Sequence, residues 1–241
     1  MADKISVCMA SYNGKKYISQ QIETILQNIT INDELIISDD GSTDGTCNII
    51  QDYVQRFPQI QLIRGPQRGV ICNFENAIRH ASGDLIFLAD QDDLWTSDKV
   101  TIIRQCFADH ECNCVIHDAE VIDNKGTVLI PSFFAFRHSK AGVIRNIWKN
   151  SYIGCCMAFR KELIPYILPF PDDIHMHDQW IGVLSDYYGH TFFCDRILLH
   201  YRRHEGNVTE LRHSSFSEMI HNRVTFIREF HKRIKQNKKK A

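Results

Sequence analysis

Residues Leu85-Ile86-Phe87-Leu88-Ala89-Asp90-Gln91-Asp92-Asp93 form an apolar run that leads directly into a cluster of carboxylates. A short, continuous apolar run of this kind predicts a strand buried on both faces, as in a parallel sheet. Ligands of such sheets bind beyond the carboxyl ends of the strands. We therefore expect the acidic run 90–93 to lie at a binding edge.

The residues before this stretch repeat the same plan, with helical patterns between the apolar runs. The runs lie at 5–10, 34–38 and 60–64, and the helical patterns lie at 17–27, 46–57 and 70–80. This alternation predicts an α/β fold with a mostly parallel central sheet flanked by helices. The ends of the first two runs, Ser11-Tyr12-Asn13-Gly14 and Asp39-Asp40-Gly41-Ser42, should then share an edge with residues 90–93.

The second half of the chain is less regular. We expect strands at 115–122, 127–130, 154–159 and 197–201, with a hairpin turn at 124–126. Helices should cover 178–188 and 214–234, a short helix should begin at Lys161, and residues 131–150 should form a loop with some helix. Since no repeat or low-complexity linker interrupts the chain, we predict one domain over 1–212 and a C-terminal helix with a basic tail over 213–241.

The composition is that of an ordinary globular protein. A net charge of -1 gives no global basic field, so we expect no nucleic-acid partner. We see no signal peptide and no apolar stretch long enough to span a bilayer. The nine cysteines are therefore interpreted as reduced thiols of a cytoplasmic protein, most of them buried.

The basic tail has two interpretations, and the sequence leaves both open. It can be a solvated helix end, which the helix dipole favours. It can also be attracted to anionic lipid headgroups, which would give peripheral contact with the inner face of the cell membrane. The tail consists of Lys232, Arg233, Lys235, Lys238, Lys239 and Lys240.

Carboxylates at a ligand-binding edge suit a diphosphate only if a divalent cation lies between them. Mg²⁺ and Mn²⁺ prefer carboxylate, water and phosphate oxygens. The spacing Asp90-x-Asp92 can aim two carboxylates into one cleft, where the metal would stabilise a departing nucleoside diphosphate. The alternative is a solvated acidic loop before a helix, which Ser97 or Asp98 could cap.

Three motifs together resemble the family 2 glycosyltransferases, which have the GT-A fold. They are Ile5-Ser6-Val7-Cys8-Met9-Ala10-Ser11-Tyr12-Asn13, Asp39-Asp40-Gly41-Ser42-Thr43-Asp44-Gly45-Thr46 and Asp90-Gln91-Asp92-Asp93-Leu94-Trp95. The resemblance covers about the first 110 residues closely. It implies an inverting, metal-dependent enzyme that uses Mn²⁺ or Mg²⁺. The third motif is especially similar to bacterial rhamnosyltransferase-type enzymes of surface polysaccharide synthesis, which suggests dTDP-rhamnose or a UDP-sugar as donor and a glycan acceptor that can be lipid-linked.

The resemblance also implies roles for residues of the donor site. Ala10 and Tyr12 should line the pocket of the nucleotide base, and Asp40 should accept a hydrogen bond from the base N3–H, with Asp39 beside it. Asp90 should face the sugar or ribose, and Asp92 should be the direct metal ligand. Residues 39–42 can equally be a turn and cap before the helix at 46.

Three downstream segments resemble family motifs concerned with the acceptor and the diphosphate. His177-Asp178-Gln179-Trp180 opens a helix, and the resemblance makes Asp178 the base that removes the acceptor proton. Alternatively, Asp178 only satisfies free N–H groups at the helix start. In the motif at 201–209, His204 would complete the metal site or touch the diphosphate, and Arg202 or Arg203 would contact phosphate. Residues 154–159 would lie under the sugars.

Two rival functions are a sugar-phosphate nucleotidyltransferase and a catalytically inactive nucleotide-sugar-binding module. The first would be expected to carry a glycine-rich loop with Arg or Lys near the N-terminus, which residues 11–15 match poorly. The second would be favoured if Asp92 or Asp178 were absent, and both are present. The donor sugar, acceptor and linkage depend on loops that the sequence does not place.

Overall fold

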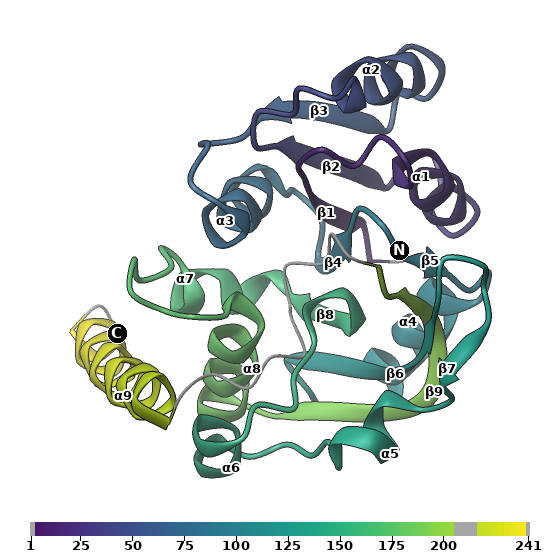
Figure 1. The fold of residues 1–241 in the computed structure, drawn as a ribbon. Helices are drawn as coiled ribbons and strands as arrows, with labels where there is room; N and C mark the ends of the chain where they lie inside the picture. Colours follow the sequence, from purple (N-terminus) through teal and green to yellow (C-terminus); the bar gives the residue numbers. More distant parts are fainter. Residues whose placement is uncertain (1–2, 205–215, 240–241) are drawn as a thin grey trace.

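The computed structural model describes residues 3–204 and 216–239 (Figure 1). Its first half follows the predicted alternation. The strands are β1 (Ile5–Ser11), β2 (Glu34–Asp39), β3 (Ile60–Arg64) and β4 (Leu85–Asp90), and the helices between them are α1 (Ile18–Leu26), α2 (Thr46–Arg56) and α3 (Val70–His80). These bounds confirm the predicted elements to within one or two residues.

One sheet runs through the whole described structure, in the order β3-β2-β1-β4-β8-β6-β9-β5. The first four strands are mutually parallel, as predicted. Beyond them, β8 (Met157–Arg160) runs antiparallel to both β4 and β6 (Cys114–Ile122). The long β9 (Thr191–Arg202) is parallel to β6 and antiparallel to β5 (Leu94–Trp95), and β7 (Val128–Ile130) pairs with β6.

Burial explains why the first strands read as continuous apolar runs. Every residue of β1 and β2 is buried, because helices cover both faces of the sheet. In register, Ala10 of β1 pairs with Ser38 of β2 and with Asp90 of β4. The three strand ends are therefore level, which confirms the predicted shared edge.

The second half supplies the remaining helices. They are α4 (Lys99–Asp109), α5 (Phe133–Arg137), α6 (Val143–Trp148), α7 (Ile164–Ile167), α8 (His177–Tyr188) and α9 (Phe216–Lys238). Asp98 is the residue before α4, but its side chain makes no capping hydrogen bond, so the proposed cap is wrong. The predicted boundary at 212–213 lies outside the described residues.

Two predicted strands differ from the structure. Residues Gly154–Cys156 form a 3₁₀ turn before β8, where we expected the strand to begin. A Cβ atom on Gly154 would lie 2.9 Å from His177 Nε2, so the turn brings the backbone against the start of α8. β9 begins at Thr191 instead of 197. Residues 191–196 do not alternate between apolar and polar side chains, but their pairing with β6 makes them part of the strand.

The C-terminal helix α9 packs on the body of the protein. Phe226 meets Trp180 edge to face at 5.6 Å. Arg233 is buried, donates to the carbonyl oxygens of Tyr166 and Pro169, and lies 5.3 Å from the Trp180 ring centroid. Arg233 is thus a packing residue and no part of a solvated or lipid-binding tail, which corrects that expectation. Lys235, Lys238 and Lys239 are exposed, and Lys240 lies outside the described residues.

The structure also bears on the expectations about the cysteines and about membrane-spanning segments. All nine cysteines are free, and seven of them are buried. Within residues 3–204 and 216–239, none of the helices combines the length and the apolar character needed to cross a membrane.

Candidate active site

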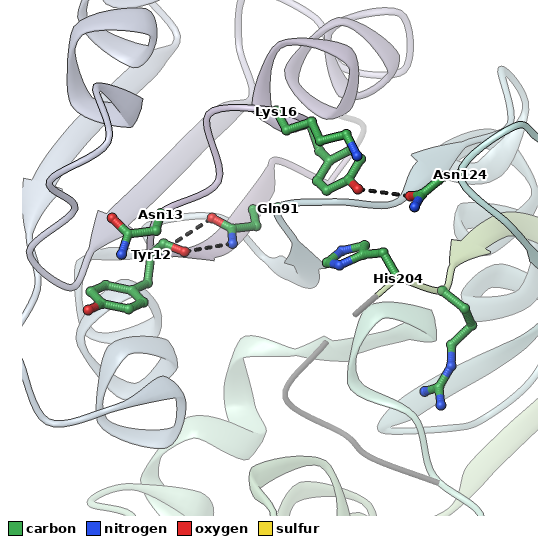
Figure 2. Close-up of a pocket in the computed structure, with 8 residues that line it drawn as sticks. Tyr12, Asn13, Lys16, Gln91, Asn124 and His204 are labelled. Carbon is green, nitrogen blue, oxygen red and sulfur yellow. Dashed lines mark hydrogen bonds between the residues drawn. The ribbon is translucent and has the colours of Figure 1, made fainter. Parts of the chain in front are cut away.

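A cavity of about 940 Å³ opens where the ends of β1, β4 and β9 come together (Figure 2). It is lined by Tyr12, Asn13, Lys16, Tyr17, Gln91, Asn124, Arg203 and His204. The lining mixes aromatic rings, two cations and amides. A site of this kind suits a ligand with a flat ring at one end and negative charge at the other.

Asp39 organises the turn after β2. Its carboxylate accepts four hydrogen bonds, from the backbone N–H groups of Gly41 and Ser42 at 3.1 and 2.8 Å and from the hydroxyls of Ser11 and Ser42, both at 2.7 Å. Burial alone would raise its pKa, but the hydrogen bonds from Ser42 and Ser11 outweigh burial and lower that pKa. Asp39 therefore shapes the turn, and its contact with a donor stays a prediction.

Asp40 fastens a neighbouring loop to the same turn. Its two carboxylate oxygens accept the backbone N–H groups of Gln67 at 2.6 Å and Gly69 at 2.8 Å. Gly41 has a φ of +96°, and a Cβ there would lie 2.8 Å from Gln67 Nε2. Each oxygen keeps a further lone pair, so Asp40 can still accept a hydrogen bond from a ligand. The turn reading of residues 39–42 is thus correct, but the residue before α2 is Gly45.

Tyr12 presents its ring to solvent, with 58% of the residue exposed. Gln91 holds the Tyr12 backbone by two hydrogen bonds of 2.9 Å: the Tyr12 N–H donates to Gln91 Oε1, and Gln91 Nε2 donates to the Tyr12 C=O (Figure 2). A Cβ on Gly14 would lie 2.1 Å from Gln91 Oε1, so the glycine makes room for this contact. Gln91 is not among the predicted site residues, since a glutamine between two aspartates carries no sequence signal of its own. Ala10 lies on β1 beside this turn.

Asp92 and His204, the two predicted metal ligands, lie together at the cavity. His204 Nε2 is 2.7 Å from Asp92 Oδ2, although 112 residues separate them. Tyr17 stacks on the His204 ring at 4.6 Å. A carboxylate oxygen beside an imidazole nitrogen is a donor pair that a divalent transition metal such as Mn²⁺ accepts, so these residues fit the predicted ion.

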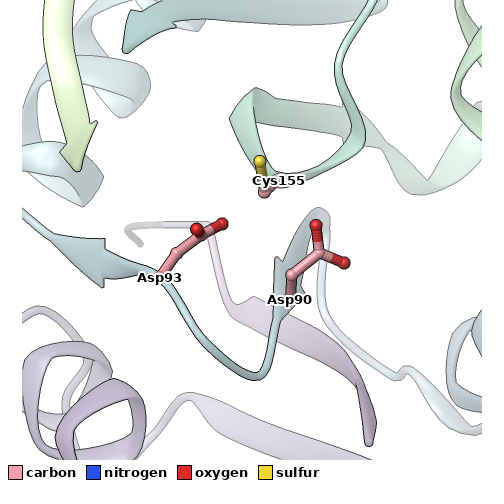
Figure 3. A group of neighbouring side chains, drawn as sticks. All are labelled: Asp90, Asp93 and Cys155. Carbon is pink, nitrogen blue, oxygen red and sulfur yellow. The ribbon is translucent and has the colours of Figure 1, made fainter. Parts of the chain in front are cut away.

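A second acidic group lies deeper, where Asp90, Asp93 and Cys155 place their ligand atoms within 4.8 Å of one another (Figure 3). Burial, followed by the charges of Asp92 and Asp178, raises the pKa of Asp90 to about 7. Asp93 is buried and accepts the N–H of Arg202 at 3.0 Å, so it anchors β9. Burial also raises the pKa of the Cys155 thiol, and a hard oxygen-seeking cation does not favour such a ligand.

Lys99 is a fully buried cation beneath this acidic group. Its ammonium donates to the Cys155 carbonyl at 2.9 Å and lies 3.9 Å from the Trp95 ring centroid. Burial lowers the pKa of Lys99 to about 8. Lys99 is not among the predicted site residues, because a lysine in the first turn of a helix is ordinarily solvated.

Asp178 lies at the start of α8 and is only 5% exposed. It accepts the N–H of Gln179 at 2.6 Å, and the Asn150 amide lies 3.5 Å away. Burial raises the pKa of Asp178 to about 6, against the opposing effect of these hydrogen bonds. Since its charge in turn raises the pKa of Asp90, the two carboxyl groups belong to one electrostatic site.

The motif at 201–209 separates into two parts. Arg202 is structural: its Nε donates to the Asp92 carbonyl and its Nη2 to Gln20 Oε1, both at 3.0 Å. Arg203 lines the cavity instead and is the better placed of the two for a phosphate. Residues 205–209 of the motif lie outside the described residues.

Comparison with known proteins connects this geometry to a family. The model of "Glycosyl transferase family 2" matches residues 6–168. Escherichia coli WfgD, a UDP-Glc:alpha-D-GlcNAc-diphosphoundecaprenol beta-1,3-glucosyltransferase, is 26% identical over 85% of this chain and 79% of its own. Shigella flexneri RfbG, a dTDP-rhamnosyl transferase, is also 26% identical, over 83% of this chain and 72% of its own.

Solved structures agree on the fold. S. aureus TarS 1-349 in complex with UDP-GlcNAc superimposes with a TM-score of 0.74 at 18% identity, over 93% of this chain and 66% of the TarS chain. The mannosyltransferase PcManGT from Pyrobaculum calidifontis, in complex with GDP-Man and Mn2+, gives a TM-score of 0.65 at 19% identity over 86% of this chain and 59% of its own. This likeness confirms the GT-A fold. With a family model that matches more than half of its residues, the chain belongs to glycosyl transferase family 2 and is a glycosyltransferase.

Proposed function

We propose that the protein is a metal-dependent, inverting glycosyltransferase that moves a sugar from a pyrimidine nucleoside diphosphate to a hydroxyl of a glycan acceptor. The observation that carries this proposal is the meeting of Asp92 and His204, 2.7 Å apart at the cavity. Held by these two residues, a divalent cation would supply Lewis-acid stabilisation to the leaving diphosphate.

The cavity supplies the remaining donor contacts. The exposed Tyr12 ring offers a stacking surface for the base, and Asp40 keeps lone pairs for a pyrimidine N3–H. Lys16 and Arg203 line the cavity and carry the positive charge that a diphosphate needs. Asp39 and Gln91 act through the backbone turns that hold Asp40 and Tyr12. We assign Asp90 to the sugar side, as the resemblance implies.

Asp178 would act as the general base. A carboxylate with a pKa of about 6 is ionised at neutral pH and is still basic enough to take a proton in a transition state. In one displacement, the acceptor oxygen would bond to the anomeric carbon, the bond from that carbon to the diphosphate would break, and the acceptor proton would pass to Asp178. Such a displacement inverts the anomeric configuration.

The names of the relatives narrow the substrate classes. The WfgD and RfbG donors are UDP-Glc and a dTDP-rhamnosyl compound, both of which carry a pyrimidine base. The WfgD acceptor is alpha-D-GlcNAc-diphosphoundecaprenol, a sugar linked to a lipid through a diphosphate. We therefore propose a UDP- or dTDP-sugar donor, Mn²⁺ or Mg²⁺ as the metal, and a polysaccharide precursor that is lipid-linked and presented at the inner face of the cell membrane.

A thermal-shift screen tests the donor and the metal together, since a ligand that binds only the folded state raises its stability. UDP, dTDP and GDP would each be added with and without Mn²⁺. We expect UDP or dTDP to raise the melting temperature more than GDP, and Mn²⁺ to increase the rise. Asp92→Ala should lose the Mn²⁺-dependent part only. The proposal would be contradicted if GDP were the only one of the three nucleotides to raise the melting temperature. It would also be contradicted if the rise with UDP or dTDP and Mn²⁺ were unchanged in excess chelator.

A further inference from the structure

One long segment of the chain contains no carboxylate. From Asn124 to Lys161 the sequence has seven lysines and arginines and neither Asp nor Glu. This segment includes α5 and α6. Asn146 is buried there, the other residues that pack towards the core are Phe133, Phe134, Val143 and Ile147, and the remaining residues of the two helices are exposed. A region this uniform in charge attracts an anionic partner.

Large apolar side chains are exposed on α6, within this segment, and on α9, which packs beside α6. On α6, Ile144 is 76% exposed and Trp148 is 60% exposed, and their spacing of four residues puts them on one face of the helix. On α9, Val224 is 61% exposed and Ile220 is 44% exposed, with the same spacing. Exposed apolar residues that gather in this way mark an interaction site more often than isolated ones do.

Arg223 joins these two helices into one surface. Its Nε and Nη2 donate to the Trp148 carbonyl at 3.2 and 2.7 Å, and its guanidinium lies 5.3 Å from the Trp148 ring centroid. Figure 1 places α6 next to the N-terminal end of α9. We call the surface formed by Ile144, Trp148, Ile220, Val224 and the cations around them the α6–α9 face.

Four cations surround α6, and none of them is in a salt bridge with another described residue. Two of them bond to backbone carbonyls only, Arg137 to Asn150 and Arg145 to His138. The four are exposed, so their charge is available to a partner. They are Arg137, Lys140, Arg145 and Lys149.

The α6–α9 face leads directly to the proposed catalytic base. Asn150 follows Lys149 in the chain, and its side-chain amide lies 3.5 Å from Asp178 Oδ1. The face is therefore next to a residue that contacts Asp178. An acceptor held in a lipid surface would meet the site if this face rested on that surface.

We propose that the α6–α9 face binds an anionic lipid bilayer and sets the orientation in which a lipid-linked acceptor enters, an inference that rests on the function proposed above. Trp and aliphatic side chains insert at the level of the headgroups, and Lys and Arg pair with their phosphates. This assignment moves the membrane contact from the C-terminal tail, where Arg233 is used for packing, to α6 and the start of α9.

Vesicle binding of the full chain tests the proposal, with vesicles of phosphatidylcholine alone and of phosphatidylcholine mixed equally with phosphatidylglycerol. Trp148 is a built-in reporter, because the other two tryptophans, Trp95 and Trp180, are buried. We expect the protein to sediment with the anionic vesicles only and its Trp emission to move to shorter wavelength. The double variant Ile144→Ser, Trp148→Ser should lose sedimentation, whereas Ile31→Ser, at a position 64% exposed elsewhere on the surface, should not.

The contribution of the lysines around α6 can be compared with that of the lysines in the C-terminal tail. The pair Lys140→Ala, Lys149→Ala should weaken binding about fivefold for each lysine removed. The tail pair Lys235→Ala, Lys238→Ala should leave binding within about twofold of the parent, which separates the two basic regions. Equal losses from both pairs would overturn the assignment to the α6–α9 face.

Other results would also overturn it. One is wild-type protein that does not sediment with anionic vesicles, and another is an Ile144→Ser, Trp148→Ser variant that sediments like the wild type. Light scattering that shows a wild-type dimer and a monomeric double variant would make the face an interface between two copies instead. UDP-induced thermal shifts, measured on the same samples, report on the proposed function independently, so its failure is distinguishable from failure of the membrane proposal.

Discussion

Replacing Asp178 with asparagine removes a buried negative charge while leaving the size of the side chain almost unchanged. Burial raises the pKa of Asp178 from 3.8 to about 6 in the folded protein. At 1.36 kcal/mol for each tenfold change in proton affinity, the ionised form costs about 3 kcal/mol of folding stability. The variant should therefore be more stable than the wild type wherever this carboxyl is ionised.

The sign of the pH dependence follows from the two pKa values. Because the folded pKa is raised, the contribution of Asp178 to stability is fully present below about pH 4 and is lost as the pH rises through about 6. Asparagine does not titrate. The two proteins should thus be similar in stability near pH 4, and the variant should gain up to about 3 kcal/mol by pH 7.

Urea unfolding over this pH range measures the stability difference. In parallel, transfer by Asp178→Asn should fall by about two to four orders of magnitude, the usual contribution of a general base, while UDP or dTDP binding persists. Asp173→Asn, at an exposed carboxylate, is the matched control and should change neither property. Wild-type turnover by Asp178→Asn would exclude Asp178 as the general base, and the same stability difference at pH 4 and pH 7 would contradict its raised pKa.

Three further variants test the donor side. Asp92→Ala should reduce transfer at least about 100-fold and abolish its dependence on Mn²⁺, and full activity in excess chelator would contradict this. Gln91→Ala removes both hydrogen bonds to the Tyr12 backbone, at about 1 kcal/mol each, so isothermal titration should show nucleotide binding weakened by up to about 30-fold. An unchanged dissociation constant would count against that role. Gly41→Ala should lose about 1–3 kcal/mol of unfolding free energy in urea, because φ is +96° and the new Cβ would crowd Gln67; unaltered stability would show that this turn relaxes.

The edge of the sheet that forms the proposed donor site could be predicted from the sequence, because the spacing of apolar residues and the order of the elements determine where it lies. Apolar runs that alternate with helical patterns make parallel strands, and parallel strands end at one edge, so residues 11–14, 39–42 and 90–93 had to meet. The pairing of Asp92 with His204 follows no such rule, because β9 reaches the site only after the chain has built β8 and β6. Only the resemblance to a family motif suggested it.

Buried polar residues mark the limit of pattern reasoning. Lys99 looks like a solvated lysine, since the sequence does not reveal that the Cys155 carbonyl and the Trp95 ring will receive its ammonium. Arg233 looks like part of a basic tail for the same reason, although its partners are carbonyls 64 and 67 residues away. In both cases the partner is a backbone carbonyl, which carries no sequence signal.

The two substrates of the proposed reaction depend on different parts of the chain. Tyr12, Asp40 and Asp92 come from strand ends of the first half, whereas Asp178 comes from α8 and adjoins the α6–α9 face. The two parts meet where β4 pairs with β8. There the charge of Asp178 contributes to the raised pKa of Asp90. Substitutions on the α6–α9 face should therefore alter the use of a lipid-linked acceptor without altering nucleotide affinity, and those around Tyr12 should do the reverse.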